Sequence, residues 1–263
     1  MSKLTRSDSM PLVKEPAQKA GILYWYLALW IVGLLMMVGM SIVIHGHPGS
    51  WPIEVDTARL LQGPHPIPCD YRKEVHTWLD TVSDRINQFN DPIPSIIIPT
   101  ILAVLLILFR RFWQAIWLLF TVASASLLWA GFSDLIGRPR AVPGDGFCVH
   151  RVIAAFSFPS GHVTHDMVLY GFLFYLTLLR PAREWRYHWL LTILQVLMVI
   201  YVLVVGYARL EAGEHHLFDV LGAYLFSLLW LAVCIVLYHV FGTWLSHHLP
   251  WEKARHNIAT TLN

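Results

Sequence analysis

Long apolar runs alternate with short polar segments along this chain. A membrane-spanning helix needs about 20 mostly apolar residues, and six runs reach or approach that length. They cover residues 21–44, 94–109, 112–132, 163–179, 189–207 and 217–244. The first run is too long for a cleaved signal peptide. The pattern therefore predicts an all-α, polytopic membrane protein with six transmembrane helices, which form a single membrane-embedded domain over residues 1–263.

Basic residues gather beside alternate runs. They are Lys3, Arg6, Lys14 and Lys19 before the first run, Arg110 and Arg111 after the second, Arg180, Arg183 and Arg186 after the fourth, and Lys253 and Arg255 after the sixth. Six spans bring these four places to one side, which the positive-inside rule assigns to the cytoplasm. We therefore expect cytoplasmic tails at 1–20 and 245–263, and an extracytoplasmic loop at 45–92.

The 45–92 loop contains two further helical patterns, at residues 51–61 and 75–89. In the second, apolar residues recur at helical spacing, at Val75, Leu79, Val82, Ile86 and Phe89. We expect short amphipathic helices lying at the membrane interface. They could cap the helix bundle or gate access of a substrate, and the pattern does not distinguish these roles.

Composition supports the membrane assignment and excludes other classes. Hydrophobic residues make up 56% of the chain and charged residues 14%, whereas a soluble domain has about 25% charged residues. The net charge of +2 gives no reason to expect a nucleic acid or another polyanion as partner.

Three cysteines are present. Cys234 falls within the sixth run, where we expect it to serve packing. Cys69 and Cys148 fall in the expected extracytoplasmic loops, where an oxidising environment would allow them to form a disulfide. Two unrelated free thiols are the alternative, because sequence does not fix disulfide geometry.

Chemically active residues cluster before the fourth and sixth runs. The first group contains Arg138, Arg140, Ser160, Gly161, His162, His165 and Asp166, and the second contains Arg209, His215, His216 and Asp219. Polar residues at membrane depth are costly and commonly functional. Both groups fall on the predicted extracytoplasmic side, so we expect them to form one site.

His215 and Asp219 are four residues apart, so on a helix they would share a face. The carboxylate could then hold one imidazole nitrogen and leave the other free to attack an electrophile. An ordinary capping or solvated pair is the alternative.

Ser160, Gly161 and His162 immediately precede or begin the fourth run. Ser160 could cap the helix, Gly161 could let a backbone N–H approach a ligand, and the helix N-terminus would favour a phosphate. His162 would then stand beside the phosphate as a general acid. Arg138 and Arg140 could bind phosphate oxygens in a bidentate manner. Either arginine could instead anchor a lipid headgroup, Arg138 more readily than Arg140.

These segments resemble the phosphatidic acid phosphatase type 2 superfamily of lipid phosphate phosphatases. That family combines Lys-x6-Arg-Pro, Pro-Ser-Gly-His and Ser-Arg-x5-His-x3-Asp. The second motif is intact at 159–162, and the third is present from Arg209 through His215 to Asp219, with Ala208 in place of the serine. The resemblance extends from about residue 135 to 225.

The first motif departs from the family pattern. One register aligns Arg140 with the motif arginine, Ser133 with the missing lysine and Ala141 with the missing proline. The other uses Arg138 and puts Gly131 at the lysine position. Neither register contains a lysine, so one positive charge of the expected phosphate cage is absent.

The resemblance implies a phosphatase domain that cleaves a lipid phosphomonoester or pyrophosphate through a phosphohistidine. His215 would be the nucleophile, Asp219 its orienting partner and His162 the general acid. Phosphate oxygens would be held by Arg140, Arg209, Ser160, Gly161 and, in the second register, Arg138. We expect no metal, because the arginines would repel a cation, and no other cofactor. Phosphoryl transfer to a lipid or sugar acceptor, or non-catalytic binding or transport of a lipid phosphate, remain alternatives. We expect the protein in a bacterial inner or plasma membrane, with its active site on the extracytoplasmic face.

Overall fold

The computed structural model describes residues 15–63, 78–89 and 91–248, and within these residues all regular structure is helical. The helices are α1 (Glu15–Gly46), α2 (Pro52–Gln62), α3 (Trp78–Phe89), α4 (Pro92–Leu108), α5 (Phe112–Ile136), α6 (Gly161–Leu178), α7 (Arg180–Arg183), α8 (His188–Glu211) and α9 (Leu217–His248). The all-α prediction is confirmed, and each predicted run corresponds to a long helix.

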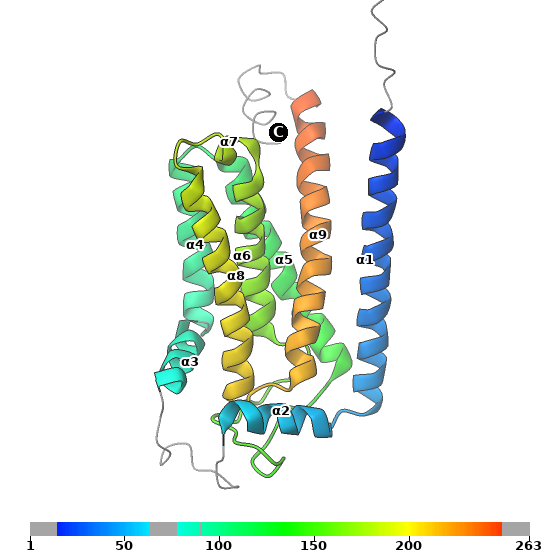
Figure 1. Ribbon diagram of the computed structural model, residues 1–263, viewed down its shortest axis with the longest axis vertical. Coiled ribbons are helices and arrows are strands. Elements are labelled where there is room, and N and C mark those ends of the chain that lie inside the picture. The colour runs from blue at the N-terminus through cyan, green and yellow to red at the C-terminus, as the bar shows by residue number, and fades with distance from the viewer. Residues whose placement is uncertain (1–14, 64–77, 90, 249–263) are drawn as a thin grey trace, which may run out of the picture.

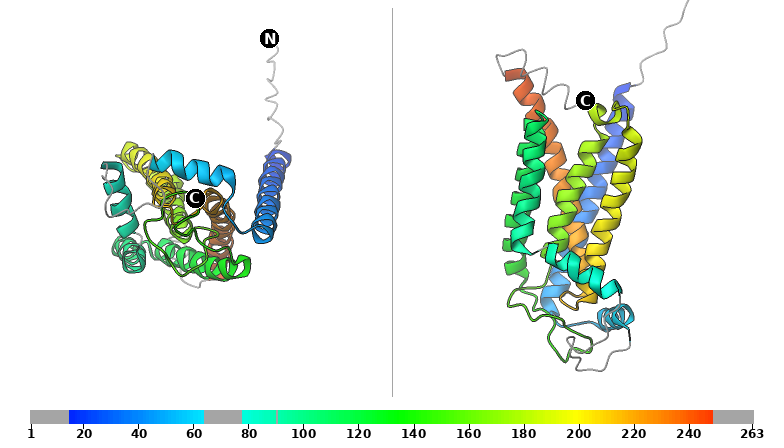
Figure 2. Two further views of the ribbon diagram at one scale, coloured as in Figure 1. Left: turned by 90° about the horizontal axis from the view of Figure 1, so that it is seen from below. Right: turned by 90° about the vertical axis from the view of Figure 1, so that its left-hand side faces the viewer.

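Six long helices run side by side along the long axis of the molecule (Figures 1 and 2). Helix α6 is central, because it packs against α5, α8 and α9. Its side chains Val168 and Phe172 are fully buried there. Helix α1 stands at the edge of the bundle and packs mainly against α9.

Four described helices are long and apolar enough to cross a membrane: α1 over Leu23–Gly46, α5, α8 and α9. A fifth candidate combines Thr81–Phe89 with α4 across a bend of 67°. Helix α6 begins with polar residues at His162, His165 and Asp166, and α4 has 17 residues. The count of six spans therefore stays a prediction.

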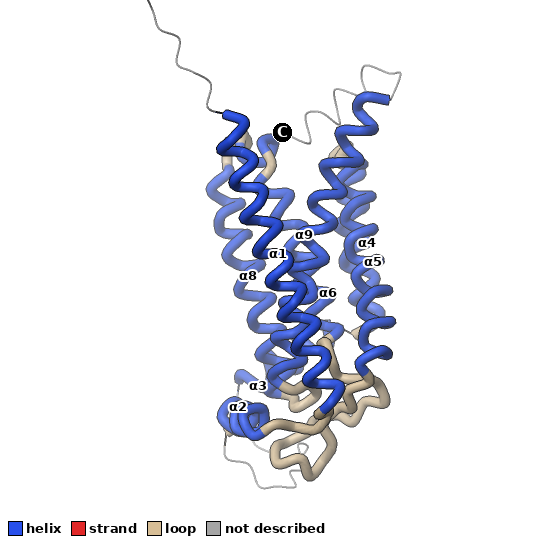
Figure 3. The backbone as a smooth tube through the Cα atoms, turned by 90° about the vertical axis from the view of Figure 1, so that its right-hand side faces the viewer, coloured by secondary structure: helices blue, strands red, loops and turns tan. Residues whose placement is uncertain are grey.

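The two ends of the bundle differ chemically. Arg111 and Ala182 line one small pocket, so the α4–α5 and α6–α8 connections meet at the same end. The long loop after α5 and the loop between α8 and α9 lie at the opposite end (Figure 3). The predicted separation of basic connections from the histidine-bearing loops is thus present in the fold.

Helix α2 lies across the end of the bundle that carries the histidine-bearing loops (Figure 1). It matches the predicted 51–61 helix and packs against α8 and α9. Its last residue, Gln62, donates to the carbonyls of Cys148 and Glu211, each at 2.8 Å, and accepts from the Cys148 N–H at 2.9 Å. These bonds fasten α2 to both loops, which makes it a cap on this end of the bundle.

Candidate active site

Backbone hydrogen bonds join the three segments that carry the sequence motifs. The Ser157 N–H donates to the Arg138 carbonyl at 2.8 Å, and the Ser160 N–H donates to the Asp219 carbonyl at 3.0 Å. Segments separated by up to about 80 residues in sequence therefore meet at one end of the bundle. The two groups of residues therefore lie together at one place in the structure, as predicted.

His215 is almost fully buried and has one nitrogen available. Its Nδ1 lies 2.9 Å from the Ser157 carbonyl. Because a carbonyl only accepts, Nδ1 carries the proton and Nε2 keeps its lone pair. Among the described residues Nε2 has no hydrogen-bond partner. This arrangement leaves a neutral imidazole with a free nucleophilic nitrogen.

The expected pairing of His215 with Asp219 is present, but the two residues do not share a helix. Helix α9 begins at Leu217, so His215 precedes the helix and does not share a helical face with Asp219. The Asp219 Oδ2 atom lies 3.6 Å from His215 Nδ1, which makes the carboxylate a nearby charge while the Ser157 carbonyl accepts the proton. A backbone acceptor carries no side-chain signal, so the sequence could not reveal it.

Burial lowers the pKa of His215 to about 3. The nearby positive charge of Arg140 contributes to this shift, while Asp219 opposes it. Desolvation penalises the charged imidazolium, so His215 is neutral near pH 7. Neutrality is the state that a nucleophilic histidine requires.

Asp219 is held chiefly by two other groups. Its Oδ2 accepts from the backbone N–H of His216 at 2.8 Å and lies 3.1 Å from His216 Nδ1. Its Oδ1 accepts from Arg138 at 2.7 Å. Asp219 therefore caps the start of α9 and fixes the loop that carries His215.

Arg138 is fully buried and all its N–H donors are used. Nε donates to the Pro48 carbonyl and Nη2 to the Gly49 carbonyl. Nη1 and Nη2 also donate to Glu54, at 3.1 and 2.6 Å, and Nη1 donates to Asp219. Burial alone would lower the pKa of Arg138, but Asp219 and Glu54 together raise it. Arg138, Glu54 and Asp219 are called here the closed cluster.

The closed cluster corrects the expected role of Arg138. A residue with no exposed surface does not anchor a lipid headgroup. A guanidinium offers five N–H donors, and these five are already bonded, so none remains for a phosphate. The geometry therefore favours the register in which Arg140 is the motif arginine.

A second group of buried polar atoms has the opposite character. Arg140 donates through Nη1 to the Glu214 carbonyl at 3.0 Å, and Arg209 donates through Nη2 to the Glu214 carboxylate. Within the described part of the chain, Arg140 Nε, Arg209 Nε and Nη1, Ser160 Oγ and His215 Nε2 have no partner. We call Arg140, Arg209, Ser160 and His215 the open cluster.

Unpaired buried donors are costly, and the open cluster gathers several of them. Burial lowers the pKa of Arg140, and the positive charges of Arg209 and Arg151 lower it further, while Glu214 opposes the shift. An anion with several oxygens would relieve both the unpaired donors and this repulsion. The open cluster is thus chemically suited to a phosphate.

Ser160 and Gly161 stand where α6 begins. Ser160 is the N-cap residue as predicted, but its hydroxyl makes no capping hydrogen bond. A Cβ on Gly161 would lie 2.6 Å from the ring of Trp129, whose Nε1 donates to the Pro159 carbonyl at 2.8 Å. Packing of Trp129 therefore requires glycine here, a steric reason that the sequence analysis did not identify.

His162 and His165 line the same cavity of about 600 Å³, together with Arg140. His165 lies 3.1 Å from Asp166 Oδ1 through Nδ1 and 3.0 Å from the Ser95 carbonyl through Nε2. Both nitrogens of His165 are therefore engaged. His162 remains the imidazole of this cavity that is placed next to the open cluster, because it lines the cavity together with Arg140 and feels the charge of Arg209.

Comparison with known families agrees with this geometry. Residues 114–242 match the model of the PAP2 superfamily. The chain belongs to this superfamily. The matched region includes the second and third motifs, Arg138 and Arg140, and it excludes α2.

A solved structure has the same fold as this PAP2 protein. It is described as the first transmembrane PAP2 type phosphatidylglycerolphosphate phosphatase, from Bacillus subtilis. The two are 18% identical, with a TM-score of 0.62, over 79% of this chain and 94% of the other. This likeness shows a shared fold. No curated protein matches the chain.

The sequence analysis of this PAP2 protein missed four groups at the site: Glu54, Arg151, Ser157 and Glu214. Glu54 is the clearest case, because its carboxylate is buried on α2. The carboxylate accepts hydrogen bonds from the backbone N–H groups of Trp51 and Phe218, at 3.0 and 3.1 Å. One signal was available. Glu54, Ala58 and Leu61 follow helical spacing, which puts a carboxylate on the inward face of α2.

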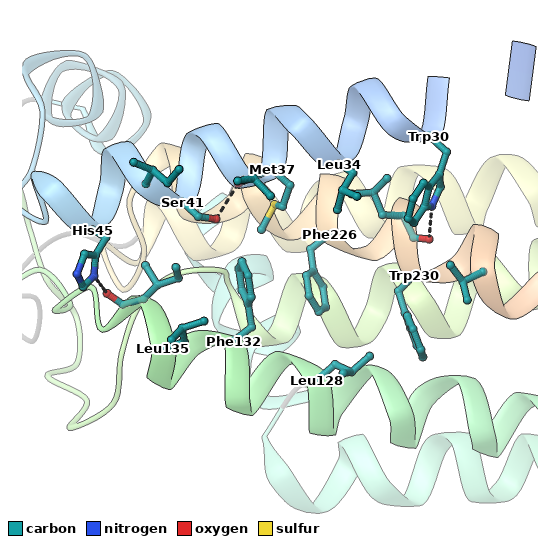
Figure 4. A pocket seen from close by; sticks show the side chains of 15 residues that line it. Trp30, Leu34, Met37, Ser41, His45, Leu128, Phe132, Leu135, Phe226 and Trp230 are labelled. Carbon is teal, nitrogen blue, oxygen red and sulfur yellow. Dashed lines mark hydrogen bonds between the residues drawn. The ribbon is translucent and has the colours of Figure 1, made fainter. Parts of the chain in front are cut away.

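A larger cavity of about 810 Å³ lies elsewhere, between α1, α5 and α9 (Figure 4). Its few polar groups are already bonded: Ser41 to the Met37 carbonyl, His45 to the Ile136 carbonyl and Trp30 to the Leu229 carbonyl. The lining is otherwise apolar. It offers no group for phosphate chemistry.

The cysteines are described in part. Cys148 is disulfide-bonded, and Cys234 is a buried free thiol in α9. Cys69 lies outside the described residues, so the Cys69–Cys148 pairing stays a prediction.

Proposed function

We propose that this PAP2 protein is an integral membrane phosphatase that hydrolyses a lipid phosphomonoester or diphosphate through a phosphohistidine on His215. One observation carries the proposal. The open cluster combines buried donors that have no partner among the described residues with a neutral imidazole whose Nε2 is free. Arg138 uses all its donors on groups of the protein, whereas the free donors of Arg140 and Arg209 would be satisfied by a ligand with several oxygens.

In this mechanism His215 Nε2 attacks phosphorus, and the bond to the leaving oxygen breaks. His162 gives its proton to that oxygen. Arg140, Arg209, the Ser160 hydroxyl and the Gly161 N–H hold the equatorial oxygens, so positioning and charge stabilise the transition state. Water then attacks the phosphohistidine, passes a proton to His162 and releases phosphate.

The reaction is proposed to need no metal. Arg140 and Arg209 bring two positive charges to the open cluster, and Arg151 approaches the same Glu214 carboxylate at 3.4 Å. These guanidinium groups supply the charge that a metal would otherwise provide, and they repel a cation.

Six membrane spans are proposed, formed by α1, α4, α5, α6, α8 and α9. Helices α4 and α6 lie parallel to the other four in the bundle. The 17 residues of α4 span about 26 Å, close to the hydrocarbon thickness of about 30 Å. Helix α6 tolerates its polar first turns because other helices surround it. The basic connections would face the cytoplasm and the open cluster the other side.

The function is tested by phosphate release from phosphatidic acid and a lipid diphosphate, in detergent with EDTA. Turnover should persist with EDTA, be inhibited by orthovanadate and disappear in His215→Ala. His45→Gln is the matched control, because His45 lines the larger apolar cavity and lies 3.0 Å from the Ile136 carbonyl, away from the open cluster. That variant should still form an acid-labile phosphoenzyme. Unchanged turnover in His215→Ala would refute the mechanism, and loss of turnover with EDTA would refute metal independence.

A further inference from the structure

The cavity beside His162 lies on one side of the open cluster. It occupies about 600 Å³ and is lined by Arg140, Gly161 and His162, whereas His215 lies outside its lining. In the proposed mechanism His215 attacks phosphorus and His162 protonates the leaving oxygen. The leaving group therefore occupies this cavity.

Arg151 lines the same cavity and forms two ion pairs there. Its Nε lies 3.4 Å from Glu214 Oε1, and its Nη1 lies 3.8 Å from Asp91 Oδ1. Its side chain is 52% exposed, whereas that of Glu214 is 4% exposed. The longer pair with Asp91, which is exposed on both sides, contributes little. Within the described residues no hydrogen bond from Arg151 is present, so its donors are available to a ligand.

Arg151 also belongs electrostatically to the site. Arg209 and Arg151 approach the two oxygens of the Glu214 carboxylate, and Arg140 donates to the carbonyl of the same residue. Glu214 and Asp91 bring two carboxylates to three guanidinium groups, so one positive charge is left over. Arg140 and Arg209 are proposed to hold the transferred phosphoryl group, which leaves Arg151 for a second negative charge nearer the cavity.

The leaving groups of the two substrate classes differ in charge. A phosphomonoester releases an uncharged alcohol after protonation. A diphosphate releases a phosphomonoester, which remains negatively charged. An arginine with free donors in the leaving-group cavity suits the second case, because charge-assisted hydrogen bonds to phosphate are strong and directional.

We propose that Arg151 binds the lipid-proximal phosphate of a lipid diphosphate and makes this enzyme selective for diphosphates over monophosphates. The proposal rests on the function proposed above and adds the substrate class. His215 Nε2 bonds to the terminal phosphorus, and the bond from that phosphorus to the bridging oxygen breaks. The electron pair stays on the bridging oxygen, which takes the proton of His162. Water then yields inorganic phosphate, so one diphosphate and one water give a monophosphate and a phosphate.

The test compares farnesyl diphosphate with farnesyl monophosphate, which share a tail, in detergent with EDTA. Arg151→Gln should lower kcat/KM for the diphosphate by roughly 10- to 100-fold, and for the monophosphate by less than about 3-fold. Arg151→Lys, which keeps the charge, should retain part of the preference. Arg85→Gln is the matched control, because Arg85 is an exposed arginine on α3 that bonds to Gln88.

Each outcome has a distinct meaning. A selective loss on the diphosphate supports the proposal. An equal loss on both substrates, or no loss on either, overturns it while the phosphatase function stands. If the unaltered protein releases phosphate from neither farnesyl substrate nor from phosphatidic acid, the proposed function fails, and this proposal fails with it.

Discussion

Two clusters built around arginines lie at the same end of the bundle and differ in one respect. In the closed cluster every donor of Arg138 meets a carboxylate or carbonyl. In the open cluster Arg140 Nε and two nitrogens of Arg209 have no partner among the described residues. Arg138 and Arg209 are equally buried, so burial does not distinguish them.

The number of guanidinium donors that have a hydrogen-bond partner does distinguish them. A guanidinium whose partners are all internal fixes the positions of those partners, here Glu54 on α2 and Asp219 on α9. A buried guanidinium with spare donors carries an unfavourable energy that a ligand removes. The first arrangement is that of a structural frame, which holds α2 and α9 in place. The second is that of a binding site.

The largest expected effect is on stability, in the closed cluster. Arg138→Gln leaves Glu54 and Asp219 buried without their shared counter-charge, and breaking such a pair costs about 3–5 kcal/mol. Thermal or denaturant unfolding in detergent should show that the free energy of unfolding has decreased by this amount. The Arg85→Gln variant should show no decrease. A stable Arg138→Gln protein would mean that the closed cluster is not a frame.

The matching change in the open cluster should act on catalysis. Arg140→Gln removes a donor from the phosphate site but leaves no carboxylate without a salt-bridge partner, since Arg140 bonds a backbone carbonyl. We expect kcat/KM to fall by roughly 10²–10³, or about 2.7–4 kcal/mol. Unfolding free energy should fall by no more than about 0.5–1.5 kcal/mol, the contribution of one hydrogen bond. An Arg140→Gln protein that is unstable but active would reverse the assignment of the two clusters.

Glu54→Gln tests whether α2 contributes to the site. The variant keeps the shape but removes the charge that faces both Nη atoms of Arg138. We expect a loss of about 1–3 kcal/mol in stability. Because Asp219 loses a well-held partner, kcat should fall by roughly 10-fold with KM little changed. A change in KM alone would instead indicate that α2 contacts substrate.

The pH dependence of stability should report the burial of His215. Its pKa is about 3 in the folded protein and about 6.5 when unfolded. Between these values the unfolded state binds more protons, so this residue makes stability fall as pH decreases from 6.5 toward 3. The slope is at most about 1.4 kcal/mol per pH unit. His215→Gln should show a shallower decline over this range, and an identical decline would mean that His215 titrates normally.

Sequence patterns were sufficient for the helices and for the four residues of the open cluster. Apolar runs fix the long helices because each must bury a face or meet lipid, and the extents of α4, α5 and α9 follow those runs closely. Arg140, Ser160, Arg209 and His215 were found because their spacing matches a family pattern. Neither the apolar runs nor the motif spacing indicates which residues outside the motifs form hydrogen bonds with the site.

The closed cluster shows what such patterns omit. Glu54 is 84 residues from Arg138 in the sequence, and no local sequence pattern indicates that the two side chains form an ion pair. Ser157 acts through its carbonyl, which every residue possesses. From the sequence, Arg138 could be a phosphate ligand or a lipid-headgroup anchor. The hydrogen bonds of its five donors in the structure exclude both roles. Long-range pairing and backbone acceptors are the features that had to come from the fold.

The most direct test of the two-cluster account is a crystal structure of the protein grown with orthovanadate. The account predicts vanadate beside His215 Nε2, with its oxygens bonded to Arg140, Arg209 and Ser160. Arg138 should remain on Glu54 and Asp219. Vanadate bound to Arg138, or a site beside His215 left without the anion under saturating vanadate, would contradict it.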